Sequence, residues 1–286
     1  MAKSDSSPDS LSTTTPTLRS QYQPSTAFHG SKLDVWVIDN NFIPSEAKGI
    51  FRSDLSELVE INVGPNKVKA IAYKSMLVER SGFFEAACHA HWETGKSRTV
   101  TLEDQDPDVF AIFVTWVLTG NVKSSTKFIE VQSSESEEVK AIRLPLQWNQ
   151  LAKCYVLGDF LQAPGFKNAV IDMLLYNMQL YHNDCELLAG WSSDQINYIY
   201  SNTTAGSQLR RIIVELVADR GGNPYVRHVD YLYELAELTM KKYHAGTARH
   251  TPFSKPRCTF HEHPDQPAGY TCTRNNQKTG KKWEVS

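Results

Sequence analysis

The sequence predicts an α+β fold: short strands in a small sheet flanked by a helix cluster, followed by a smaller all-helical region. Three observations predict it. Apolar residues alternate over 59–63, directly before the turn-forming residues 64–67, which is typical of a β-hairpin. A second short alternating run lies near residue 100. From residue 107 onward the apolar spacing is that of amphipathic helices.

The composition limits the partners that we expect. An apolar fraction of 41% is enough for a sizeable core, and a net charge of −2 gives no general attraction to nucleic acid or acidic membranes. No apolar run approaches the roughly 18 residues of a membrane-spanning helix, so no membrane partner is expected. We expect a chain of the cytoplasm or nucleus, in which Cys88, Cys154 and Cys185 are reduced and buried.

The first elements follow a tail. Residues 1–30 are rich in Ser, Thr and Pro and are predicted to be a disordered N-terminal tail. The hairpin strands occupy 58–63 and 68–73, and two short helices follow. Met76 begins the first, and Ser81 caps the second, which carries Phe83 and Phe84.

The next segments have clear boundaries. Residues 98–102 predict a strand with Val100 and Leu102 facing inward. Asp106 and Pro107 begin a helix that ends at Gly120. That helix has two apolar stripes, which predict packing on more than one side. The stripes are Val109, Phe113 and Trp116, and Phe110, Val114 and Val117.

Residues 121–143 contain an acidic, Ser-rich run and are predicted to be a mobile, exposed insertion. Two helices follow. The first carries Trp148, Leu151, Ala152 and Tyr155 and stops before Pro164; the second carries Phe166, Val170, Met173 and Leu174.

Residues 187–245 predict a helical C-terminal region of three helices. Ser193 caps the first, and Ser207 caps the second, which ends at Gly221. The third carries an apolar stripe of Val229, Leu232, Tyr233, Ala236 and Met240. Residues 246–286 are basic and contain several prolines and glycines, so we expect an extended tail.

The order of elements over residues 54–180 resembles that of the BTB/POZ domain, an α+β interaction fold. Several segments are similar to its motifs: 63–64, 76–84, 100–110, 116–120, 154–161 and 166–170. Trp92-Glu93, the acidic insertion and Leu209-Arg210-Arg211 resemble BTB proteins of filamentous fungi.

The resemblance implies a protein-interaction module that homodimerises through helices around 74–88 and the segment before the hairpin. Met76, Phe83 and Phe84 supply apolar anchors for such an interface; the alternative is that all three belong to the core. The resemblance also implies a substrate adaptor of a cullin-type ubiquitin ligase. The scaffold contact would then involve His91, Trp92 and Glu93.

Other functional classes have weaker support. Residues 90–97 lack the first glycine of a P-loop and precede a strand instead of a helix, so neither an enzyme nor a bound cofactor is expected. The alternative is a nuclear regulatory or scaffold protein whose basic tail binds zinc or nucleic acid. Cys258, His261, His263 and Cys272 could ligate zinc, although their spacing is not a common one. Nucleic-acid binding is not favoured, because the tail has no recognition helix.

Overall fold

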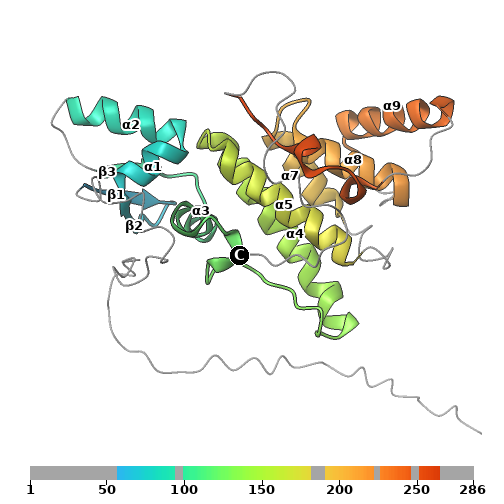
Figure 1. The fold of residues 1–286 in the computed structure, drawn as a ribbon, viewed down its shortest axis with the longest axis horizontal. Helices are drawn as coiled ribbons and strands as arrows, with labels where there is room; N and C mark the ends of the chain where they lie inside the picture. Colours follow the sequence, from blue (N-terminus) through green and yellow to red (C-terminus); the bar gives the residue numbers. More distant parts are fainter. Residues whose placement is uncertain (1–56, 94–98, 182–190, 222–225, 246–250, 265–286) are drawn as a thin grey trace, which may run out of the picture. The chain divides into compact units, whose positions relative to one another are not determined.

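The computed structural model describes residues 57–93, 99–181, 191–221, 226–245 and 251–264, all within one compact unit. Its sheet is small and mixed (Figure 1). Strand β1 (Leu58–Val63) lies in the centre, antiparallel to β2 (Val68–Tyr73) and parallel to β3 (Thr99–Leu102). The predicted α+β class is confirmed.

The hairpin strands have the predicted bounds, and the alternating residues Val59, Ile61 and Val63 are buried. Leu58 pairs with Tyr73 and Val63 with Val68, so the two strands are joined by a four-residue loop. The backbone of Gly64 is left-handed, and its N–H donates to the Leu102 carbonyl at 2.8 Å. A side chain at position 64 would be strained in that conformation, and the loop fastens the hairpin to the end of β3.

Helix α3 (Pro107–Thr119) follows the predicted boundaries. The Asp106 carboxylate accepts from the backbone N–H of Asp108 at 3.0 Å and caps the first turn. Gly120 is left-handed, and its N–H donates to the Trp116 carbonyl at 2.7 Å. Both predicted stripes are buried, because the helix lies between the sheet and the helices that follow.

An aromatic cluster joins helices α2 (Gly82–Glu93), α3 and α5 (Pro164–Leu180). Its ring centroids are 5.2 to 6.4 Å apart, within the range of favourable ring contacts. The cluster comprises Phe84, Phe110, Phe113, Trp116 and Phe166. Packed aromatic side chains thus hold the interior of this part of the fold together.

The segment 121–143, predicted to be a mobile, exposed insertion, is anchored at several buried positions. A 3₁₀ turn, η2 (Val122–Ser124), follows α3, and Val122, Phe128 and Val131 are buried. Two glutamines of helix α4 (Glu137–Phe160) satisfy the loop backbone. The acidic run at 133–138 is largely exposed, and so are Val139 and Ile142 at the start of α4.

Helices α4 and α5 form an antiparallel pair (Figure 1). They approach most closely at Gly158, where an added Cβ would lie 2.8 Å from Cγ of Lys167 and 3.2 Å from a ring carbon of Phe166. Glycine at this position therefore permits the close contact between the two helices.

The C-terminal helical region contacts α4 through helix α7 (Ser193–Asn202) and through Trp191, which lies just before it. The Trp148 and Trp191 rings stack with centroids 5.3 Å apart. Helix α7 is capped by Ser192 and not, as predicted, by Ser193. Gln195, three residues after Ser192, completes a reciprocal capping box with it. Ser207 occupies the predicted cap position of helix α8 (Gln208–Arg220), but its side chain makes no capping bond.

Buried Arg210 joins three helices. Its guanidinium donates to the carbonyls of Tyr200 and Thr203 and lies 4.3 Å above the Tyr200 ring. It also lies 3.6 Å from the carboxylate of Glu234 on helix α9 (Val229–Ala245), which accepts from the Tyr200 hydroxyl at 2.6 Å. The Leu209-Arg210-Arg211 segment therefore has a structural role.

Helix α9 packs with the face opposite to the predicted stripe. Tyr231 is buried, and Leu235 and Leu238 are half-buried. The stripe residues Val229, Leu232, Tyr233, Ala236 and Met240 are all exposed. The stripe was expected to face the core, and this expectation is wrong. The helix is apolar on two faces, and the face that contacts α7 and α8 is the other one.

Residues 251–264, hereafter the strap, correct the prediction of an extended tail over 246–286. They form the 3₁₀ turns η3 (Pro252–Ser254) and η4 (Arg257–Phe260) and contact α5 and α8. Phe260 is completely buried, because its ring lies below the charged groups of Arg211 and Lys255. The remaining parts of the predicted tails lie outside the described residues.

Candidate protein-interaction surface

Helix α2 begins in a tight junction with the end of α4. The Ser81 hydroxyl donates to the Leu161 carbonyl at 2.6 Å and accepts from the Phe84 N–H at 3.3 Å. The N–H groups of Gly82 and Phe83 donate to the carbonyls of Gln162 and Leu161. Carbonyls of one helix end thus satisfy the free donors of the other, which fixes the side chains around this junction.

Two of the predicted interface anchors belong to the core. Phe84 is fully buried, and Met76, on helix α1 (Lys74–Arg80), is 5% exposed. The prediction that they are surface anchors is therefore corrected, since side chains with almost no accessible area cannot supply much contact area to another chain in this conformation. Large apolar residues are usually interior, and here that reading holds.

Phe83 is half-buried and remains at the surface. Its ring centroid lies 5.2 Å from that of Phe160, at the end of α4. The Phe160 side chain is 45% exposed. We call these two rings the Phe83/Phe160 patch. Sequence reasoning missed Phe160, although a signal existed: it lies outside the apolar stripe through Trp148, Leu151 and Tyr155.

Trp92 and Glu93 occupy the last turn of α2, just before the segment that leads to β3. Their side chains, and that of His91, lie outside the described residues. Residues 90–97 therefore lead from a helix end toward a strand, as predicted, and not from a strand into a helix as in a P-loop.

A groove of about 730 Å³ lies beside the patch, between the α1–α2 junction and the start of α5. Lys167 is buried in its wall, 2.5 Å from the Asp159 carboxylate and 2.7 Å from that of Glu262. Burial alone would lower the pKa of Lys167, but the hydrogen bonds to Asp159 and Glu262, together with the electrostatic effects of Tyr155 and Glu262, outweigh burial and raise the pKa above its usual value. The groove wall therefore contains a fixed ammonium group that is shared between two carboxylates.

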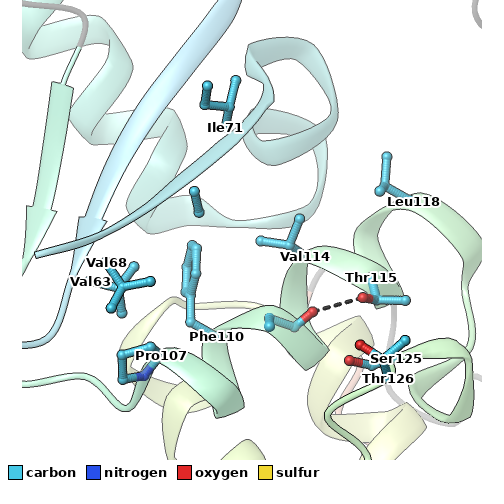
Figure 2. A pocket seen from close by; sticks show the side chains of 12 residues that line it. Val63, Val68, Ile71, Pro107, Phe110, Val114, Thr115, Leu118, Ser125 and Thr126 are labelled. Atoms are coloured by element: carbon cyan, nitrogen blue, oxygen red, sulfur yellow. Dashed lines mark hydrogen bonds between the residues drawn. The ribbon is translucent and has the colours of Figure 1, made fainter. Parts of the chain in front are cut away.

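An apolar pocket of about 110 Å³ lies between the hairpin and α3. Figure 2 shows Val63 and Val68 of the hairpin facing Phe110 and Val114 of α3. Its volume approaches the roughly 150 Å³ of a cavity that admits benzene. The pocket borders β2, an outer strand of the described sheet, and has room for one aliphatic side chain of a partner.

The strap brings together only part of the predicted zinc ligands. The Cys258 sulfur lies 3.3 Å from Nε2 of His263, whereas Nε2 of His261 lies 3.0 Å from the Asp172 carboxylate. Cys272 is outside the described residues. Within the described ranges, no three side chains of His, Cys, Asp or Glu gather closely enough to hold a metal ion.

The strap's basic side chains are used within the chain. Lys255 pairs with Glu215 at 2.6 Å, and Arg257 pairs with Asp172 at 3.1 Å. Charges compensated in this way attract phosphates weakly, so this part of the predicted basic tail gives no support to nucleic-acid binding.

Two of the predicted buried thiols are confirmed. Cys88 and Cys154 are free and buried, and burial raises the pKa of both thiols, so they stay protonated at neutral pH. Cys185 lies outside the described residues.

No family model matches this chain. Among the described residues, no helix combines the length and apolar character that crossing a bilayer requires. The geometry of the surface is therefore the basis for a functional proposal.

Proposed function

We propose that this chain is a protein-interaction module of the BTB/POZ type, which self-associates through the Phe83/Phe160 patch. The proposal is supported by the sequence resemblance and by an arrangement compatible with it. A hairpin is followed by a short helix pair, a parallel third strand, a packed helix and then an antiparallel helix pair. A BTB/POZ domain uses such a unit to bury apolar surface between chains, with no bond-making chemistry.

The observation that carries the proposal is the exposure of Phe160 beside Phe83. Aromatic side chains at the centre of a contact commonly supply most of its binding energy. The α2–α4 junction holds this pair through backbone hydrogen bonds, so little ordering entropy remains to be lost on binding.

The test is the mass of the full chain, measured by light scattering over a range of concentrations. Phe160→Glu should raise the dissociation constant of self-association by about tenfold to a hundredfold. Ile142→Glu is the matched control: this residue is also exposed on α4, near its other end. A chain that stays monomeric at high concentration, or an equal effect of the two variants, would overturn the proposal.

The adaptor role is a sharper form of the same proposal. It is supported by the resemblance at Trp92 and Glu93, which lie together in the last turn of α2. Capture of a purified cullin scaffold by the full chain, lost in Glu93→Lys, would support it. No capture by the unmutated chain would end it without affecting the self-association result.

A further inference from the structure

The outer face of helix α9 carries five exposed large apolar side chains that the other described residues leave uncovered. Its exposed fractions are high for apolar side chains: 76% for Val229, 42% for Leu232, 69% for Tyr233, 55% for Met240 and 79% for Tyr243. Together with Ala236, these residues recur every three or four positions and form one stripe along the helix. The opposite face, with Tyr231, Leu235 and Leu238, packs on the rest of the chain.

The spacing of this outer stripe is the same in both directions along the chain. Leu232 and Met240 lie four residues before and after Ala236, and Val229 and Tyr243 lie seven residues before and after it. A two-fold axis at Ala236 would therefore place Leu232 against Met240 of a second copy, and Val229 against Tyr243. The smallest side chain would lie at the crossing point, where two helices approach most closely.

The charges beside the stripe are arranged for the same geometry. The first half of α9 carries Asp230 and Glu237, and the second half carries Lys241, Lys242 and His244. Asp230 and Lys241 are eleven residues apart, about three turns, so they lie on the same flank. In an antiparallel pair, that flank faces the same flank of the partner helix, at nearly equal height.

We propose that α9 pairs with α9 of a second copy of this chain, antiparallel and centred on Ala236. Lys241 pairs with Glu237 of its own helix at 2.7 Å, and its exposed ammonium group also reaches Asp230 of the other copy in this arrangement. Two such symmetric contacts set the direction. A parallel pair would instead leave Asp230 and Lys241 about three turns apart along the axis and would lose the favourable antiparallel alignment of the helix dipoles. The surface is separate from the Phe83/Phe160 patch, so the inference does not rest on the proposed function.

The first test changes the apolar stripe. Leu232→Glu in the full chain should weaken this contact by about a hundredfold, because it places a charge in the centre of the stripe. Asp194→Lys, an exposed change on α7, is the control and should leave the mass distribution unchanged. An unchanged association in Leu232→Glu, with the helix content intact by circular dichroism, would overturn the proposal.

The second test asks whether the two α9 helices are antiparallel. Asp230→Lys and Lys241→Glu each place two like-charged contacts across the axis, and each variant alone should self-associate about tenfold more weakly. Mixed one to one, they restore two attractive contacts, so the mixture should associate more tightly than either variant alone. A mixture no tighter than its components would overturn the antiparallel arrangement.

The two self-contacts can be told apart. Association that Phe160→Glu reduces and Leu232→Glu does not would support the proposed function and overturn this inference. The reverse result would support α9 pairing and overturn the role of the Phe83/Phe160 patch.

Discussion

Ser81 shows how one hydroxyl determines the position of an aromatic patch. It was predicted as a helix cap from its place before Phe83 and Phe84. In the structure it caps α2 and also donates to a carbonyl eighty residues away, at the end of α4. The local half of this role could be read from sequence spacing, whereas the long-range half depends on tertiary packing.

Removing that hydroxyl should destabilise the fold. Ser81→Ala deletes one capping bond and leaves the buried Leu161 carbonyl without this donor, so we expect a loss of about 1–2 kcal/mol. Urea denaturation measures it. Ser201→Ala, an exposed change on α7, should cost little, and equal losses in the two variants would show that Ser81 has no special role.

Asp172 provides a pH-dependent contact for the strap. Burial alone would raise the pKa of Asp172, but the hydrogen bond from His261 and the charges of His261 and Arg257 outweigh burial and lower it. A carboxyl whose pKa is lower in the folded state stabilises that state at neutral pH. The stabilisation is lost as the pH falls below about 4 and through the lowered pKa.

Asp172→Asn should therefore cost about 2 kcal/mol at pH 7, and the difference from the unmutated chain should shrink as the solution is acidified. Denaturation at a series of pH values measures this. Asp104→Asn, in an exposed loop, should show no such trend. A loss that is constant with pH would contradict the assigned role of the charge.

At the scale of elements, the α4–α5 contact depends on the absence of a side chain. In the interior of a helix, alanine normally stabilises relative to glycine by roughly 0.5–1 kcal/mol. At Gly158 the new Cβ would overlap the stem of buried Lys167. We therefore expect Gly158→Ala to destabilise by about 1–3 kcal/mol, measured by denaturation; a stabilised variant would contradict the close approach.

Arg210, on α8, holds α7 and α9 together by contacting Tyr200 and Glu234. Arg210→Ala removes the donor of the Tyr200 and Thr203 carbonyls and leaves Glu234 without its cationic partner. We therefore expect the free energy of unfolding to fall by about 3 kcal/mol. Hydrogen exchange should show faster opening of α9 than of α3. Lys69→Ala breaks an exposed ion pair with Glu60 and should cost under about 1 kcal/mol, so a similar loss in both variants would refute the anchor.

At the scale of the whole molecule, two self-complementary surfaces on one chain have a consequence that neither has alone. One two-fold contact closes a dimer, whereas two different two-fold contacts link copies into longer assemblies. If both proposals hold, the mass of the full chain should rise beyond that of a dimer with increasing concentration. Light scattering checks this.

Variants separate the two contributions. Phe160→Glu and Leu232→Glu should each limit the assembly to a dimer, and the double variant should be monomeric. A dimer that forms in the double variant would show that a different surface carries self-association.

The sequence by itself determined the local elements. Alternation placed β1 and β2, and Asp106 and Gly120 bounded α3, because strand pairing and helix caps depend on residues close in the chain. The small sheet and the two buried faces of α3 followed from the same patterns.

Tertiary structure alone decided which apolar residues face inward. Phe84 and Met76 are interior while Phe160 is exposed, and the predicted stripe of α9 faces outward while its other face packs. Phe128 and Phe260 are buried in segments that their composition marked as exposed. Periodicity identifies apolar faces, but burial depends on which distant surfaces meet, and local sequence does not encode that choice.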